Sequence, residues 1–218
     1  MDEKDAREPR SRRPFFFLIL GLYLTLRGYH SLDNDQAYRL PLLLHRQDPA
    51  LYADDPFVRA FDDFNPHRGS LVLLDAVTRL AGLSPGLLVL FLLTFLATCW
   101  GIERLARVVW SDSGTMAGRA MVAVVLVLMA KAGNIGTNHL FEAMVLDRLM
   151  GLALAWVALA ILVSQPERGW WASAVALGGT ALIHPSLGLQ IGLVTMGSWV
   201  VWSLLGSRGT VTLSLIHI

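Results

Sequence analysis

The sequence predicts an all-α protein, a polytopic transmembrane helix bundle with about six spans and a large external first loop that contains interfacial helices. Hydrophobic residues make up 54% of the 218 residues and charged residues only 16%, with a mean hydropathy of +0.52. Soluble domains carry roughly 25% charged residues. The apolar residues also fall in long runs between short polar segments, and this arrangement indicates that lipid covers them.

The net charge and the cysteine content exclude other classes of protein. A net charge of +1 provides no basic field for nucleic acid. The expected partner is membrane lipid, because the excess of apolar residues needs lipid to cover it. The chain has one cysteine, Cys99, within an apolar run, which excludes an intramolecular disulfide and a cysteine-based metal site.

The N-terminal third divides into a head, a span and a loop. Residues 1–13 form a polar, basic head, and residues 14–28 contain the first expected span, whose apolar run is followed by Arg27 and not by a small-residue cleavage site. Residues 29–83 form the expected external loop. Its last part, residues 69–83, is apolar but carries Asp75 and Arg79 four positions apart on one helix face, which favours an interfacial helix over a span.

The rest of the chain is expected to form a transmembrane bundle of about five spans over residues 84–206. The apolar runs cover residues 84–100, 116–130, 149–163, 170–183 and 189–205. Residues 207–218 do not resemble a helix terminus. We therefore expect the chain to be a truncated fragment, with its last residues not native.

Basic residues fall on one side of the membrane if these spans alternate and residues 69–83 do not cross. The head, the connection 103–119, Arg168 and Arg208 then share a side, which the positive-inside rule makes cytoplasmic. The opposite, external side receives the loop 29–68, the segment 134–148 and His184-Pro185. A span at 69–83 would move every later loop to the other side.

Two polar sets in the first loop have different expected roles. Asp33 and Asp35 follow the first span and flank Asn34, so that they can hold a hard divalent cation or supply a general base, or form a solvated turn cap. Further on, Asp55-Pro56 and Asn65-Pro66-His67 are typical of turn starts, so Asp55 and Asn65 have structural roles.

Two more polar sets lie at the external ends of later spans. The segment from Asn134 to Arg148 contains His139, Glu142 and Asp147, and ionisable residues near a bilayer are candidates for function. Asp147 and Arg148 alternatively form a structural pair. His184 combines a titratable imidazole with a helix break at Pro185, and such a histidine is more often an interfacial cap than a catalyst.

The order of these features resembles the type C glycosyltransferase superfamily, in its uncharacterised bacterial multispan branch, whose members use lipid-linked sugars and keep an acidic motif in a large external loop after the first span. Asp33-Asn34-Asp35 occupies that place. The interfacial stretch ending at Pro85, the Leu-rich span after it and the segment Glu103 to Arg107 also resemble the family's juxtamembrane helix and second span. Members usually have more spans than this chain.

The resemblance implies a reaction, a set of site residues and a location. A sugar would pass from a polyprenyl-phosphate-linked donor on the external face of a bacterial inner membrane. Asp33 would activate the acceptor and Asp35 would help to hold Mg²⁺ or Mn²⁺. The residues implied in binding the lipid phosphate or the substrate are Arg39, His139, Glu142, Arg148 and His184. The alternatives are a transporter or channel component, for which the apolar runs carry few ionisable groups, and a non-catalytic membrane scaffold.

Overall fold

The computed structural model describes residues 13–31, 35–109, 116–129, 141–165 and 168–206, and within these ranges every regular element is an α-helix. The helices are α1 (Arg13–Arg27), α2 (Asp35–Gln47), α3 (Pro56–Asp63), α4 (Arg68–Ala81), α5 (Leu83–Val109), α6 (Met116–Met129), α7 (Asp147–Ser164), α8 (Trp170–Ile183) and α9 (Pro185–Gly206). The all-α prediction is therefore confirmed for the described part of the chain.

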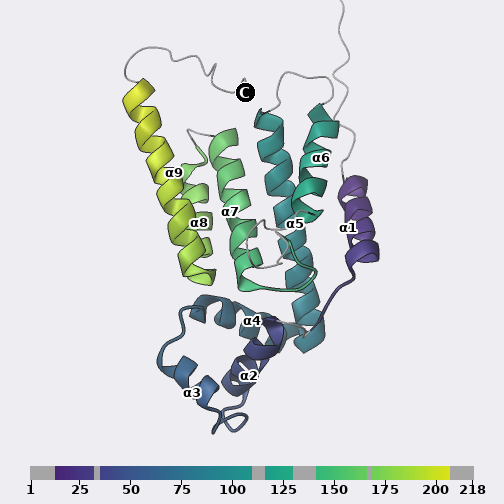
Figure 1. Ribbon diagram of the computed structural model, residues 1–218, viewed down its shortest axis with the longest axis vertical. Helices are drawn as coiled ribbons and strands as arrows, with labels where there is room; N and C mark the ends of the chain where they lie inside the picture. The colour runs from purple at the N-terminus through teal and green to yellow at the C-terminus, as the bar shows by residue number, and fades with distance from the viewer. Residues whose placement is uncertain (1–12, 32–34, 110–115, 130–140, 166–167, 207–218) are drawn as a thin grey trace, which may run out of the picture.

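The helices form two layers. Figure 1 shows α1 and α5 to α9 standing side by side as a bundle, while α2, α3 and α4 lie together at one end of it. The helix α4 runs across that end and does not stand within the bundle. The polar residues of the predicted first loop are thus gathered in one layer, which we call the end layer (residues 35–81).

The bundle is built around α5 and α7, two apolar helices of 27 and 18 residues that pack directly on each other. Phe91, Phe95 and Cys99 on α5 are fully buried in the core. Phe95 contacts the rings of Tyr23 on α1 and Phe141, at centroid distances of 5.6 and 5.7 Å. These aromatic contacts attach both α1 and the segment that leads into α7 to the centre of the bundle.

Two of the described helices are long and apolar enough to cross a membrane. They are Leu83–Val109, with 27 residues, and Asp147–Ser164, with 18 residues. The other segments expected to span are also helical in their described parts, but their apolar stretches are shorter, as in Phe17–Arg27 and Trp170–Ile183. The last helix begins at Pro185, four residues before the expected start at 189, because proline is favourable at the first helical position.

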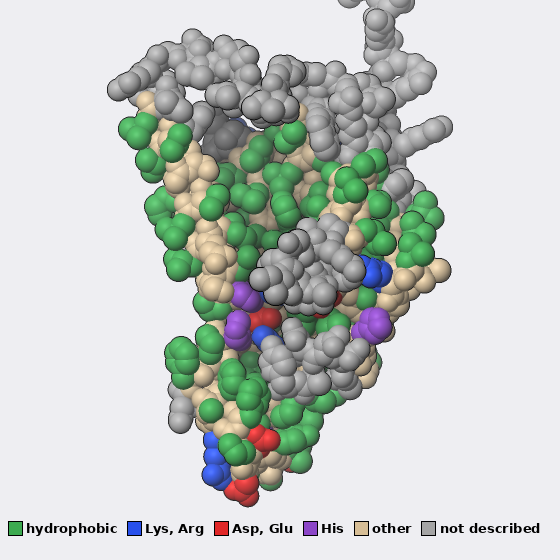
Figure 2. Space-filling view, viewed as in Figure 1, with side chains coloured by type: hydrophobic (Ala, Val, Ile, Leu, Met, Phe, Trp, Pro, Cys, Tyr) green, Lys and Arg blue, Asp and Glu red, His purple; other side chains and the backbone are tan. Residues whose placement is uncertain are grey.

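The outward surface of the bundle is apolar, as the space-filling view shows over most of its described face (Figure 2). On α8, Val175 and Leu182 are 72% and 70% exposed, and on α9, Val194 and Trp199 are 70% and 64% exposed. Soluble proteins rarely expose contiguous apolar surface of this extent. The bundle therefore offers a continuous apolar exterior that water would solvate poorly.

The end layer is held together by polar contacts. Asp75 on α4 accepts hydrogen bonds from Arg46 at 3.1 Å and from Arg79 at 2.7 Å, and Gln47 donates to Thr78 at 2.9 Å. The predicted Asp75–Arg79 pairing on one helix face is confirmed. These bonds fix α2 against α4.

The predicted turn residues also perform their structural roles. Asp55 caps α3 by accepting hydrogen bonds from the backbone N–H groups of Phe57 and Val58. Asn65 accepts from the backbone N–H of His67 at 2.9 Å. The loop expected at 29–68 is thus largely helical, with two short helices joined by capped turns.

Candidate functional site

Several residues predicted from the sequence lie at or beyond the limits of the described structure. Asp33 and His139 fall outside the described residues. Asp35 is the first residue of α2, one helical turn before Arg39, and its backbone alone is described. The expected acidic site at Asp33 and Asp35 therefore stays a prediction.

The structure brings four ionisable side chains together where the end layer meets the bundle. They are Arg39 on α2, His67 at the start of α4, Asp147 at the start of α7 and His184 between α8 and α9. We call this set the polar junction. Figure 2 shows histidine, acidic and basic side chains gathered at that level of the surface.

Asp147 is the centre of the polar junction. Its Oδ2 atom accepts a hydrogen bond from Arg39 Nη2 at 2.7 Å and lies 2.6 Å from His67 Nδ1. The Asp147 side chain is only 6% exposed. A carboxylate so far removed from water needs such partners to remain charged.

His67 contacts Asp147 without the geometry of a hydrogen bond. Its Nδ1 atom is buried and has no hydrogen-bond partner among the described residues. Burial lowers the pKa of His67, the nearby charges of Arg39 and His184 lower it further, and Asp147 acts in the opposite direction. The net effect keeps His67 neutral near pH 7, with a lone pair on one ring nitrogen.

His184 lies beside His67, with ring centroids 5.1 Å apart in an edge-to-face arrangement. It ends α8, and Pro185 starts α9 directly after it. The Nδ1 atom of His184 lies 3.2 Å from Ser186 Oγ and 3.3 Å from the backbone N of Leu187. His184 therefore acts at a helix end, as predicted, but it also takes part in the polar junction.

Two glycines let the helices that carry these residues approach closely. A Cβ atom at Gly69, two residues after His67, would lie 2.0 Å from the carbonyl oxygen of Leu182 near the end of α8. A Cβ atom at Gly151 on α7 would lie 3.3 Å from the Cβ of His184. The start of α4, the end of α8 and α7 thus meet through positions without a side chain.

The carbonyl groups of the segment before α7 accept hydrogen bonds from the end layer and from the residues that lead into it. The Gln36 side chain donates to the carbonyl of Val145 at 2.9 Å, and the backbone N–H of His30 donates to the carbonyl of Ala143 at 2.8 Å. Both bonds are made by residues just before or within α2. They place Asp147 next to Arg39.

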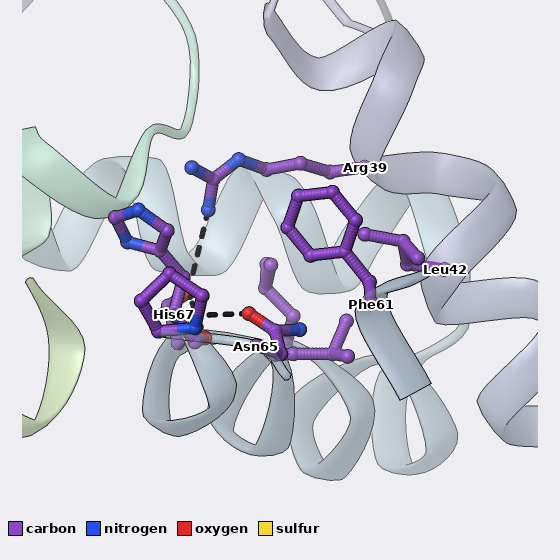
Figure 3. A pocket seen from close by; sticks show the side chains of 9 residues that line it. Arg39, Leu42, Phe61, Asn65 and His67 are labelled. Carbon is purple, nitrogen blue, oxygen red and sulfur yellow. Dashed lines mark hydrogen bonds between the residues drawn. The ribbon is translucent and has the colours of Figure 1, made fainter. Parts of the chain in front are cut away.

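A pocket of about 180 Å³ opens beside the polar junction within the end layer. Figure 3 shows Arg39 reaching over it from α2, opposite Asn65 and His67, with Phe61 and Leu42 on the other wall. Arg39 also donates to Ser70 across the pocket at 3.4 Å. The pocket has one polar and one apolar wall, which suits a ligand with a polar group and an apolar part.

Glu142 and Arg148 form an ion pair of their own. The Arg148 backbone N–H donates to Asp147 Oδ1 at 2.9 Å, but the Arg148 side chain binds Glu142 while Asp147 binds Arg39. The alternative of a side-chain pair between Asp147 and Arg148 is therefore not what the structure shows.

The sequence does not single out His67 as a site residue, and it offers Asp147 only as one of the ionisable candidates between Asn134 and Arg148. His67 follows Asn65-Pro66 and was assigned to a turn, although it precedes Gly69 closely and resembles His184 in lying next to a proline-bounded helix end. The alternative for Asp147 is a structural pair with the adjacent Arg148. The only sequence signal for joining them was that both lie at ends of helices expected on the same side of the membrane.

The polar junction has the composition of a metal-binding site. His67, Asp147 and His184 each offer one ligand atom, and these three atoms lie within 4.8 Å of one another. Two imidazole nitrogens and a carboxylate oxygen are common ligands of transition metals in proteins. Comparison of the chain with protein-family models, with curated proteins and with solved structures finds no match to any of them.

Proposed function

We propose that the chain is a multi-pass integral membrane protein of the plasma membrane whose helices α1 and α5 to α9 cross the bilayer. The exposed apolar side chains of α8 and α9 support this, since Leu182, Val194 and Trp199 are each at least 64% exposed. Lipid would cover this surface at no cost. The chain alternates direction through the six helices, so that α1 runs toward the end layer and α5 away from it (Figure 1).

The end layer would then lie on the external side of the membrane. Its side of the bundle receives residues 28–31, the segment 141–146 and His184, which are the parts expected to be external. The opposite ends of the helices carry Glu103, Arg104 and Arg107 near the end of α5. The positive-inside rule favours the cytoplasm for that side and for the N-terminal head.

We propose further that the protein transfers a sugar from a polyprenyl-phosphate-linked donor. The observation that carries this is the convergence of Arg39, His67, Asp147 and His184 beside a pocket at the level where the polar layer meets the apolar bundle. A lipid-linked phosphate has its charge at this depth, because its chain lies in lipid and its headgroup lies in water. Arg39 is the group suited to a phosphate, since a guanidinium offers five N–H donors in a planar fork.

The proposed roles combine the structure with the resemblance seen in the sequence. Arg39 would hold the donor phosphate and stabilise the charge that develops as the leaving group departs. Asp33 would act as base toward the acceptor, and it precedes α2 by two residues, so the chain leads directly from it to Arg39. The small pocket would hold the transferred group while the lipid chain stays in the membrane.

The transferase proposal predicts that Asp33→Asn lowers transfer by more than about 100-fold and Arg39→Lys by about tenfold, because the first removes a base and the second replaces a fork by a point charge. The measurement uses the purified full chain in liposomes with radiolabelled polyprenyl-phosphate monosaccharides and an added membrane extract that supplies hydroxyl and amide acceptors for the sugar. Release of free polyprenyl phosphate is followed over time.

The matched control is His45→Gln, because His45 lies on α2 with Arg39 but contacts the carbonyl of Leu51 and does not belong to the polar junction. It should keep wild-type rates. Full activity of Asp33→Asn, or no release from any donor by the folded wild type, would contradict the proposal. Flux of a solute through liposomes containing the protein would instead support a transporter.

A further inference from the structure

We infer that His67, Asp147 and His184 form a binding site for a transition-metal dication of the zinc class. Their three ligand atoms lie within 4.8 Å of one another at the meeting point of α4, α7 and the α8–α9 connection. Metal binding at this place is a property of the chain itself. It does not depend on the transferase reaction proposed above.

The distances fit a metal centre after a small adjustment. Ligand atoms in a tetrahedral site lie about 3.3 Å apart when each is about 2.0–2.1 Å from the metal. The nitrogen of His67 and the oxygen of Asp147 are 2.6 Å apart, and the third ligand atom lies within 4.8 Å of both. A shift of the order of 1 Å in the side chains would bring the three atoms to a common centre.

An unsatisfied polar atom points to a missing partner. His67 Nδ1 is buried and has no hydrogen-bond partner within the described part of the chain, although the Asp147 carboxylate lies 2.6 Å away. Buried polar atoms are almost always satisfied, so each exception needs a cause. A metal ion between the imidazole and the carboxylate would bind both, and His67 Nδ1 would then have a partner.

The ligand types select the class of metal. Two imidazoles and one carboxylate suit zinc and neighbouring first-row dications, whereas magnesium and calcium prefer sites made of oxygen atoms. Three protein ligands leave a coordination position for water or for another molecule. The proposed site thus uses other residues than the Mg²⁺ or Mn²⁺ site expected at Asp33 and Asp35, and its imidazoles favour zinc over magnesium.

The surrounding residues orient the ligands as in known metal sites. Arg39 donates to Asp147 at 2.7 Å, which fixes the carboxylate, and Ser186 Oγ lies 3.2 Å from His184 Nδ1, where it can accept a hydrogen bond from that nitrogen in the Nδ1–H tautomer. That tautomer leaves the lone pair on Nε2 for a metal. In the other tautomer Nδ1 accepts the hydrogen bond from the Leu187 backbone N–H at 3.3 Å, so metal binding through Nε2 requires this hydrogen bond to be given up. Such hydrogen bonds to ligands hold the tautomer and the ring direction.

The charge around the site favours an anion at the open position. The dication and the Arg39 guanidinium together outweigh the single carboxylate of Asp147, and Arg39 also lines the adjoining pocket. A phosphate would therefore be a suitable fourth ligand. If the transferase proposal is correct, the metal would hold the donor phosphate, and this one consequence does rest on that proposal.

The test measures metal binding by the full chain in detergent, with its affinity tag removed because a histidine tag binds zinc. After treatment with a chelator, zinc and cobalt are titrated without substrate. We expect one ion per chain for the wild type and binding weakened by about 100-fold or more in His67→Gln, Asp147→Asn and His184→Gln, since changes outside the ligand set alone cost about 10–100-fold. His45→Gln should bind as the wild type does.

Two further measurements keep the result decisive if a variant does not fold. X-ray absorption of the zinc-loaded wild type should show nitrogen and oxygen ligands with scattering from two imidazoles. Excess Mg²⁺ should not displace the zinc. Folded wild type that binds no zinc, variants that bind it unchanged, or a ligand set without imidazole would each overturn the inference. The zinc titration contains no sugar donor, so a chain that binds no zinc would not contradict the transferase proposal. A chain that transfers no sugar would likewise not contradict the metal site.

Discussion

At the scale of single residues, Asp75 shows how one carboxylate stabilises the end layer. It accepts hydrogen bonds from Arg46 and Arg79, and its side chain is 12% exposed. Burial by itself raises the pKa of Asp75, but the hydrogen bonds from Arg79, Gln47 and Arg46 outweigh it, so that the pKa lies below its ordinary value. The ionised carboxylate therefore stabilises the end layer.

We predict that Asp75→Asn lowers the free energy of unfolding by about 1–2 kcal/mol near pH 7, because it removes charge-assisted hydrogen bonds to two partly exposed arginines. The folded pKa is lowered, so the stabilisation is complete above the unfolded pKa of about 4 and is lost as the pH falls through the folded value. Thermal unfolding in detergent, at about six pH values between about 3 and about 8, measures how the stability difference between wild type and variant depends on pH.

The control for this prediction is Asp54→Asn. Asp54 pairs with Arg59 within the same layer, but its side chain is 97% exposed, so its loss should leave the unfolding midpoint unchanged. A difference between wild type and Asp75→Asn that did not shrink as the pH fell from about 8 to about 3 would contradict the assignment, because protonation of Asp75 removes its ionic bonds to the arginines.

At this scale the sequence predicted local contacts well and distant ones poorly. The cap at Asp55 and the Asp75–Arg79 pair join residues at most four positions apart, so spacing alone identified them. Asp147 binds Arg39, which is 108 positions away. No spacing rule reaches that far, and the adjacent Arg148 was the more obvious partner for Asp147.

Glycines control packing at the scale of helices. Besides Gly69, a Cβ atom at Gly101 on α5 would lie 2.7 Å from the backbone of Trp156 on α7, and one at Gly188 on α9 would lie 2.3 Å from the Cα of Ala181 on α8. Small residues allow helix backbones to approach closely in membranes, where packing drives association. The crossings α5–α7 and α8–α9 thus depend on residues that carry no side chain.

We predict that Gly69→Ala destabilises the protein by about 1–3 kcal/mol and weakens metal binding, because its Cβ would meet the Leu182 carbonyl oxygen at 2.0 Å and move the start of α4 away from α8. The midpoint of thermal unfolding and a zinc titration measure the two effects. Gly69 is not a ligand, so the loss of binding would report on the position of His67.

Gly178→Ala on α8 is the matched comparison. Nothing lies within 4 Å of a Cβ atom at Gly178, so this change should be neutral or should stabilise the helix by up to about 1 kcal/mol. Equal effects of the two substitutions would show that the close approach at Gly69 is unimportant.

The elements themselves were predicted unevenly. The apolar runs located the bundle helices, and Trp170–Ile183 agrees with its predicted limits, because composition alone separates such runs from loops. The helices α2 and α3 were not predicted individually within the loop. Their polar composition resembles that of a loop, and α2 even contains Pro41, so that contacts with α4 and not local pattern determine their structure.

At the scale of the whole molecule, the alternation of helix direction gathers the polar segments at one end. We predict opposite labelling of the two ends in intact cells. Asp54→Cys in the end layer should react with a membrane-impermeant maleimide from outside, whereas Arg168→Cys should react only after the membrane is opened.

The native Cys99 is fully buried and should not interfere with this labelling, which the wild type checks directly. Labelling of both positions from the same side would contradict the six crossings, and reversed labelling would place the N-terminus outside. The sequence predicts the number of spans only through its apolar runs and their orientation only through charge counting, so this measurement tests both independently.

The polar junction joins side chains from residues 39, 67, 147 and 184, and this order has a consequence for how the protein is made. Arg39 and His67 leave the ribosome long before His184 does, so the end layer is synthesised before α7, α8 and α9 are available to meet it. Asp147 and His184 then complete the set one after the other. The junction is therefore among the last parts of the described structure to form, and a metal ion bound there would stabilise the chain only once membrane insertion had reached α8.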